Sequence, residues 1–149
     1  MSTADVAAAQ ALAEACATAL YADDRASQGL GMVVESVAPG RSVLRMTVRE
    51  DMTNGHGICH GGFIFTLADS AFAFACNTYN RVTVAQAAKI DFLRPARQGD
   101  VLHAEARELS RGARSGLYDV VVRRANGELV ACFRGNSHSS DKSLIEDHS

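Results

Sequence analysis

The residues best suited to chemistry lie between Asn54 and Asn77, in the stretch NGHGICHGGFIFTLADSAFAFACN. A polar, Gly-rich loop leads there into an apolar segment of helical length, which holds a single acid, Asp69. The residues three and four positions away from Asp69 include no cation that would pair with it on a helix. A carboxylate in such apolar surroundings is a reactive base or nucleophile rather than a solvated charge. The alternative is a buried acid paired with the backbone or a distant Arg.

Two glycines, Gly61 and Gly62, stand where this loop meets the apolar segment. The first backbone N–H groups of a helix have no intrahelical partner, and together with the helix dipole they suit a developing oxyanion. The alternative is that both glycines serve a tight turn only. Asn54 is either a left-handed turn residue before Gly55 or an amide that orients a water or an acid. His60 either fixes the loop by a hydrogen bond or supports the oxyanion donors.

The spacing of these groups limits how they can act together. Asp69 follows Gly61 by eight residues, which is roughly 12 Å along a helix. Productive contacts are about 3 Å long, so one carbonyl group does not reach both groups of the same helix. If both act on one substrate, the donor and the acid come from different chains. The spacing therefore predicts a site at a homodimer interface.

The sequence HxxCH, formed by His56, Cys59 and His60, resembles part of a metal site. Structural zinc takes four ligands, and the remaining candidates are remote and unpatterned, so we predict no metal. Cys59 beside His60 also suggests a thiol nucleophile, but adjacency in sequence is not what brings a catalytic Cys–His pair together.

The elements that must position these residues follow from the hydrophobic pattern. We expect helices over 3–20 and 63–79 and strands over 32–37, 42–48, 82–94, 101–110, 117–124 and 129–140. Strands in series with short turns pair antiparallel. One antiparallel sheet wrapped around the second helix would explain why that helix is apolar on nearly every side. This α+β architecture is the hot-dog arrangement.

The length of 149 residues predicts one domain, 1–149, with a helical N-terminal extension over 1–28 and a polar, frayed tail over 140–149. The net charge of −2 and the absence of a basic run argue against nucleic acid as a partner. No apolar run reaches the roughly 18 residues of a membrane span. The N-terminus lacks the basic lead-in of a secretory signal, and four scattered cysteines suggest free thiols, so we expect a cytoplasmic protein.

The motifs NGHGICHGG, FTLADSAFAFACN, KIDFLRPARQGD and FRGNSH together resemble the hot-dog-fold thioesterases of phenylacetic acid degradation, over roughly residues 29–138. The resemblance implies hydrolysis of an aryl-acyl-CoA, such as hydroxyphenylacetyl-CoA or phenylacetyl-CoA, to the acid and free CoA. It implies no cofactor, because coenzyme A is part of the substrate. It also implies a homotetramer built from dimers with shared active sites.

Carried over by motif, the resemblance makes Asp69 the catalytic acid, Gly61 the oxyanion donor, Asn54 the orienting amide and His60 the motif histidine. Whether Asp69 activates a water or attacks the carbonyl directly stays open. Some related enzymes have a Ser or Thr near Ala85 that helps to hold the water, whereas this chain offers only Gln86.

For the substrate we expect contacts from the loop, the helix start and nearby arginines, because Arg suits phosphate groups. These residues are Gly62, Phe63, Arg94, Pro95, Arg111 and Arg114. Three other functions remain open: a medium-chain acyl-CoA thioesterase, a hot-dog enoyl-CoA hydratase and a non-catalytic acyl-CoA-binding module. The hydratase is disfavoured because the LADSAFAFAC segment lacks the His that such enzymes pair with their Asp.

Overall fold

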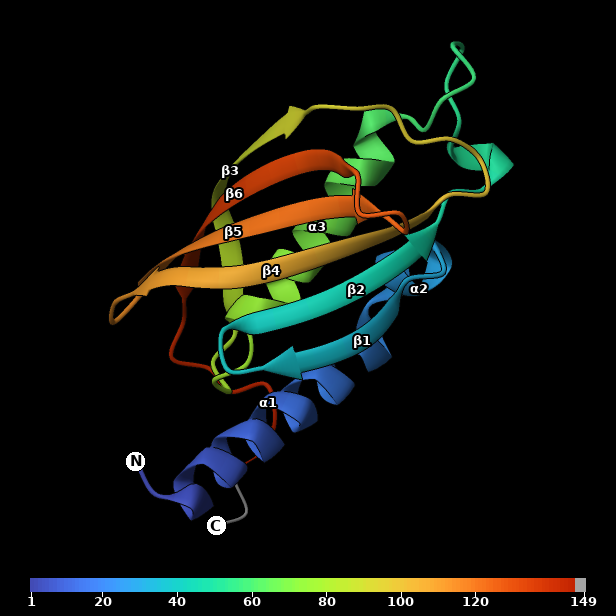
Figure 1. Cartoon of the computed structure of the whole chain (residues 1–149). Helices are drawn as coiled ribbons and strands as arrows, with labels where there is room; N and C mark the ends of the chain where they lie inside the picture. The colour runs from blue at the N-terminus through green and yellow to red at the C-terminus, as the bar shows by residue number, and fades with distance from the viewer. Residues whose placement is uncertain (147–149) are drawn as a thin grey trace.

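A six-stranded antiparallel sheet curves around one long helix in the computed structural model, which describes residues 1–146 (Figure 1). The helices are α1 (Thr3–Asp23), α2 (Arg25–Gly29) and α3 (Gly61–Cys76), with a 3₁₀ turn, η1, at Glu50–Met52. The strands are β1 (Val33–Ala38), β2 (Arg41–Thr47), β3 (Thr83–Phe92), β4 (Val101–Arg111), β5 (Ser115–Arg124) and β6 (Leu129–Ser139). The predicted α+β wrap of a sheet around the apolar helix is confirmed.

The strand order in the sheet is β1-β2-β4-β5-β6-β3. Strands β4, β5 and β6 pair with their neighbours in the chain, as the short turns predict. Strand β3 does not pair with β4; it pairs with β6, from Thr83 opposite Ser139 to Phe92 opposite Ala131. The segment 93–100 therefore carries the chain across the sheet, and β3 becomes an edge strand.

The N-terminal helix begins and ends at recognisable signals. Ser2 and Asp5 form a capping box at its start. The helix runs to Asp23, three residues beyond the expected end, and stops because Asp24 leaves the helical region at φ −84° and ψ 83°. A second, short helix, α2, follows at once, so the expected break in YADDRASQGLG is one residue long.

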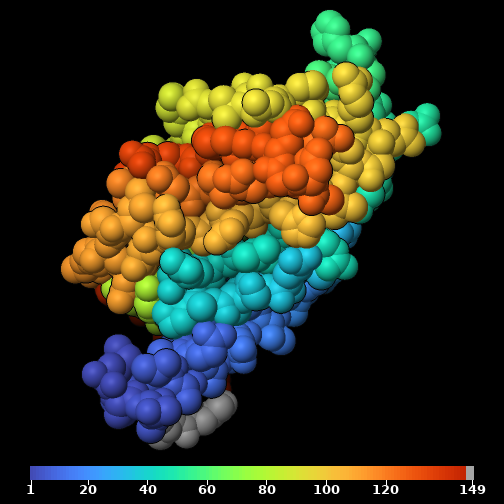
Figure 2. Space-filling view, viewed as in Figure 1, coloured from blue at the N-terminus to red at the C-terminus, as the bar shows by residue number. Residues whose placement is uncertain are grey.

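The core lies between α3 and the inner face of the sheet. No helix of residues 1–146 covers the outer face, which Figure 2 shows. Phe72 of α3 is 1% exposed, and its ring contacts Tyr118 and Phe133 at centroid distances of 5.5 and 5.8 Å. Its ring also lies on Gly135 of β6, where a Cβ atom would come within 2.9 Å of Cζ. The absence of a side chain at Gly135 thus sets how closely α3 approaches the sheet.

The C-terminal segment differs from the frayed tail that we expected. Asn80, with a φ of 57°, accepts hydrogen bonds from the Leu144 and Ile145 amides and donates one to the Ile145 carbonyl. The segment is therefore attached to the domain up to Ile145. Residues 147–149 of the predicted tail lie outside the described residues. No helix in the part of the chain that the structure describes is long and apolar enough to cross a membrane.

Replacement of Gly135 by Ala should lower the free energy of unfolding by about 1–3 kcal/mol, because Phe72 is enclosed by other rings and has no room to move. Urea unfolding followed by circular dichroism measures this. Gly29→Ala is the matched control, since a Cβ atom there meets nothing within 4 Å. Equal midpoints for the two variants would contradict the proposed contact.

Candidate active site

The start of α3 presents one free backbone donor. His60 is the N-cap: its Nδ1 accepts a hydrogen bond from the Gly62 amide at 2.9 Å, and its carbonyl accepts one from the Phe63 amide at 3.0 Å. The Gly61 amide has no hydrogen-bond acceptor within residues 1–146. His60 therefore satisfies two of the unpaired donors at the helix start and leaves the third open. This is the hydrogen-bonding role that the sequence offered for His60.

That free donor borders a cavity of about 440 Å³. Its lining is mainly apolar and comes from the loop before α3, from α3 itself and from the end of β3: Asn54, Ile58, Cys59, Gly61, Ile64, Phe92, Leu93, Arg94 and Pro95. The Phe92 ring is 53% exposed and lies over the helix start, 3.0 Å from where a Cβ atom on Gly61 would be. If the apolar part of a small ligand filled this cavity, a carbonyl oxygen attached to that part could accept a hydrogen bond from the Gly61 amide.

Asp69 lies on the less buried face of α3. Positions 62, 66, 69 and 73 are partly or fully exposed, and their spacing puts them on one side of the helix, whereas most other positions of α3 are buried. The Asp69 carboxylate makes no hydrogen bond or ion pair with any residue of 1–146. Burial, followed by the charge of Asp24, raises the pKa of Asp69 above its usual value. This is the electrostatic character expected of a reactive base.

Within one chain, Asp69 does not line the cavity beside Gly61. Both residues lie on the unbroken helix Gly61–Cys76, so their separation remains roughly 12 Å. The inference that two chains would have to combine them stays a prediction.

Asn54 belongs to the loop turn and also lines the cavity. Its φ is not positive; the left-handed residue of this loop is Gly57, at φ 76°. The expected left-handed role of Asn54 is thus wrong, because its side-chain Oδ1 accepts hydrogen bonds from the His56 and Ile58 amides and holds the turn in an ordinary conformation. Its Nδ2 donates to no acceptor among residues 1–146 and remains free for a ligand.

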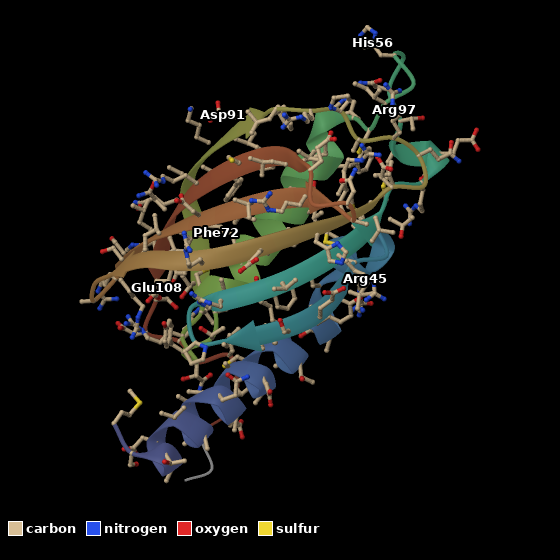
Figure 3. The ribbon with its side chains drawn as sticks, in the orientation of Figure 1. Arg45, His56, Phe72, Asp91, Arg97 and Glu108 are labelled. Atoms are coloured by element: carbon tan, nitrogen blue, oxygen red, sulfur yellow. The ribbon has the colours of Figure 1, made fainter. Side chains whose placement is uncertain are left out.

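The HxxCH residues do not converge. His56 is exposed at the tip of the loop (Figure 3), Cys59 is 3% exposed, and His60 is engaged with α3. No group of three or more His, Cys, Asp or Glu side chains in the described chain is placed to hold a metal ion. Burial, with a smaller contribution from the Asp100 charge, raises the pKa of Cys59 to about 11, so the thiol is protonated at neutral pH.

The substrate-contact residues expected from the sequence fall into two places. Gly62 and Phe63 lie at the start of α3, and Arg94 and Pro95 line the cavity. Arg111 is the last residue of β4 and Arg114 lies in the turn after it, near Glu108 and at the opposite end of the sheet from the loop that carries His56 (Figure 3). Both are engaged: Arg111 stacks on the Tyr79 ring at 3.5 Å, and Arg114 pairs with Asp141 at 3.1 Å.

Several residues near the cavity were not singled out from the sequence. Phe92 and Leu93 are 53% and 49% exposed and line the cavity with Gly61, although the sequence indicated only that they belong to a strand. Arg97 lies at the same end of the molecule (Figure 3), and its guanidinium has no ion-pair partner within residues 1–146. Gln86 is the extra residue of a β-bulge in β3, which re-aims a side chain locally.

Replacement of Cys59 by Ala should leave kcat/KM within about threefold of wild type, because a protonated, buried thiol is not a nucleophile. Assays of CoA release measure this, and alkylation by iodoacetamide at pH 8 should leave Cys59 unmodified in the native protein. A loss of 100-fold or more in a folded Cys59→Ala variant would reinstate the thiol mechanism.

Comparison of the sequence and the structure with known proteins identifies the family to which this chain belongs. The model of the thioesterase superfamily matches residues 56–131. The acyl-coenzyme A thioesterase PaaI of Escherichia coli is 45% identical over 122 residues, which cover 82% of this chain and 87% of that protein.

Solved structures agree with the sequence comparison. The structure of the E. coli PaaI protein from the phenylacetic acid degradation operon superposes with a TM-score of 0.89 at 42% identity, covering 90% of this chain and 97% of that chain. A variant of the phenylacetic acid degradation protein PaaI from Thermus thermophilus gives a TM-score of 0.74 at 40% identity, over 77% and 98% of the two chains. The resemblance stated from the sequence motifs is confirmed, and the chain belongs to the thioesterase superfamily of hot-dog proteins.

Proposed function

We propose that this protein hydrolyses an aryl-acyl-CoA thioester, with phenylacetyl-CoA or a ring-hydroxylated phenylacetyl-CoA as the substrate, to the free acid and CoA. The observation that carries the proposal is the free Gly61 amide at the mouth of an apolar cavity, on the same helix as the unpaired carboxylate of Asp69. Similarity to PaaI proteins from phenylacetic acid degradation supports the aryl-acetyl group. The cavity of about 440 Å³ falls within the usual size range of small-ligand pockets, about 300–1,000 Å³.

In the proposed reaction the thioester carbonyl oxygen accepts a hydrogen bond from the Gly61 amide, aligned with the positive end of the α3 dipole. Asp69 takes a proton from a water molecule while the water oxygen bonds to the carbonyl carbon. The resulting oxyanion collapses, the C–S bond breaks, and its electron pair leaves on the CoA sulfur. In the alternative route the Asp69 oxygen itself attacks and water then hydrolyses the anhydride. Thiolate leaves readily, so neither route requires a second acid.

We further propose that the site is completed by a second chain, with Gly61 from one protomer and Asp69 from its partner. Two features support this homodimer. Strand β3 is a ten-residue edge with six consecutive exposed residues, 84–89, and such a long free edge is suited to pair with another strand. The less buried face of α3, which carries Asp69, is also available to a partner. Association of two dimers into a homotetramer through other surfaces is part of the same proposal.

Other residues take supporting roles in this proposal. Arg94 is exposed at the cavity, where its guanidinium donates to the Leu129 carbonyl at 3.4 Å and lies 3.9 Å from the Glu128 carboxylate. In this proposal Arg94 turns from these weak contacts to a phosphate of coenzyme A, and the Nδ2 of Asn54 orients the water or the acid. No cofactor is needed, since coenzyme A arrives with the substrate. All four cysteines are free thiols, which supports a cytoplasmic location.

Replacement of Asp69 by Asn should abolish CoA release, with a loss of at least about 1,000-fold in kcat, because Asn neither accepts the proton nor attacks. The raised pKa of Asp69 means that its ionised form is disfavoured in the fold, so the variant should unfold at the same temperature as wild type or a higher one. Thiol release with a panel of phenylacetyl-, benzoyl- and straight-chain CoA esters measures the reaction. Hydration of an enoyl-CoA, or binding without release by wild type, would contradict the proposal.

The shared site is tested by mixing two inactive variants. Gly61→Pro removes the amide hydrogen, and proline is favoured at the first position of a helix. Its Cβ atom would lie 3.0 Å from the Phe92 ring, which is 53% exposed and can turn aside. When Asp69→Asn and Gly61→Pro chains are unfolded and refolded together, heterodimers regain one intact site, and about one quarter of wild-type activity should return. Each variant refolded alone is the control. No recovery from a mixture that contains heterodimers would place both groups of one site in a single chain.

A further inference from the structure

A second carboxylate, Asp24, is connected by hydrogen bonds to the part of α3 that carries Asp69. Asp24 separates α1 from α2 and caps α2, and it lies outside residues 56–131, which the family model matches. Its Oδ1 accepts a hydrogen bond from the Ser27 amide at 2.9 Å, and its Oδ2 accepts one from the Ser27 hydroxyl at 2.6 Å. The carboxylate is therefore fixed in orientation by two donors.

Ser27 in turn attaches α2 to α3. Its hydroxyl lies 2.8 Å from the hydroxyl of Ser70, and the two residues are 0% and 9% exposed. Because Ser27 gives its only hydroxyl hydrogen to Asp24, Ser70 must be the donor between the two serines. The chain of hydrogen bonds thus runs from Ser70 through Ser27 to Asp24, and each bond polarises the next. Ser70 follows Asp69 directly in the sequence. The row of hydrogen bonds therefore connects the segment that carries Asp24 to the helix that carries Asp69.

No cation compensates these two acids. Neither Asp24 nor Asp69 forms an ion pair with any residue of 1–146, and the neighbouring Arg25 guanidinium donates to the Ala22 carbonyl at 3.4 Å instead. Asp24 accepts two hydrogen bonds, whereas Asp69 accepts none. A carboxylate near a second negative charge is harder to ionise.

The buried titratable side chains of α3 and of the strands beneath it, Cys76 and Tyr118, have raised pKa values and stay protonated at physiological pH. The Cys76 thiol, which interacts with Asp69, has a pKa raised to about 12, mainly by burial. Below α3 the buried side chains of β2, β4, β5 and β6 are apolar or hydroxyl-bearing, with Tyr118 as their titratable member. The Tyr118 hydroxyl donates to Glu108, and the Tyr21 hydroxyl of α1 donates to the Met32 carbonyl. After burial, which is the larger cause, the charge of Asp24 is the contribution that raises the pKa of Asp69.

We propose that Asp24 is a positioning residue for thioester hydrolysis: its carboxylate, fixed by the Ser27–Ser70 hydrogen bonds, makes Asp69 a stronger base and nucleophile. The proposal rests on the function proposed above for Asp69. It assigns the N-terminal segment a part in the chemistry, in addition to covering the core. The physical reason is that repulsion between two fixed negative charges is relieved when Asp69 accepts a proton or forms a bond.

The direct test is the ionisation of Asp69 itself, measured by ¹³C NMR of labelled aspartate carboxyl groups and assigned with Asp69→Asn. In Asp24→Asn the titration midpoint of Asp69 should fall, because the repelling charge is gone. Asn is as good an N-cap as Asp, so α2 should remain in place. Asp23→Asn is the matched control: it removes the same charge one residue earlier, from an exposed side chain, and should leave the midpoint unchanged. Asp24→Ser, a second neutral cap, should behave as Asp24→Asn does.

Kinetics then connect this charge to the reaction. In Asp24→Asn the acidic limb of the kcat/KM profile should move to lower pH, and kcat on the plateau should fall about two- to tenfold, since a weaker base is slower. Asp23→Asn should change neither. A midpoint that does not move in a folded Asp24→Asn overturns this inference while wild-type hydrolysis upholds the proposed function. If the Asp69 midpoint falls in Asp24→Asn but the wild-type protein releases no CoA, the coupling between the two acids stands and the proposed function is overturned.

Discussion

The close seating of α3 on the sheet determines the geometry of the candidate site. Phe72 is held between the rings of Tyr118 and Phe133 and lies directly on Gly135. A helix held in this way does not slide or rotate along the sheet, because close-packed interiors lack the free volume for such movement. The position of the helix start beside the cavity and the outward direction of Asp69 both follow from this one contact surface.

The cap at the start of α3 then selects which donor is available. His60 uses its ring nitrogen and its carbonyl for the Gly62 and Phe63 amides, so Gly61 is the one of these three helix-start amides that has no acceptor in the described chain. The N-terminus of a helix has positive potential because several of its amides lack acceptors. Here His60 accepts hydrogen bonds from two of these amides, so the Gly61 amide is left to donate to a ligand. The straight helix also keeps this donor and Asp69 roughly 12 Å apart. That separation makes a second chain part of the proposed mechanism.

The N-terminal segment links local helix capping to the electrostatics of the site. Asp24 is an N-cap of α2, an ordinary structural role, and the Ser27–Ser70 hydrogen bond brings this cap against α3. In the proposed coupling, a residue that ends one helix and begins another thus influences the ionisation of Asp69. The free edge of β3 and the open face of α3 extend the same site toward a partner, so the proposed chemistry involves the N-terminal segment, the central helix and the edge of the sheet.

The sequence by itself determined the order and type of the elements, the long apolar helix with its uncompensated acid, and the glycines at its start, because periodicity and capping are local properties. Only the tertiary structure decided that β3 pairs with β6, that Phe92 covers the helix start, and that Arg111 and Arg114 lie far from the cavity. It also revealed that Asn54 holds its turn through Oδ1 and that Ser27 links Asp24 to the segment of α3 that carries Asp69. These features depend on contacts between distant segments, whose free energies arise from packing and burial that no local pattern records.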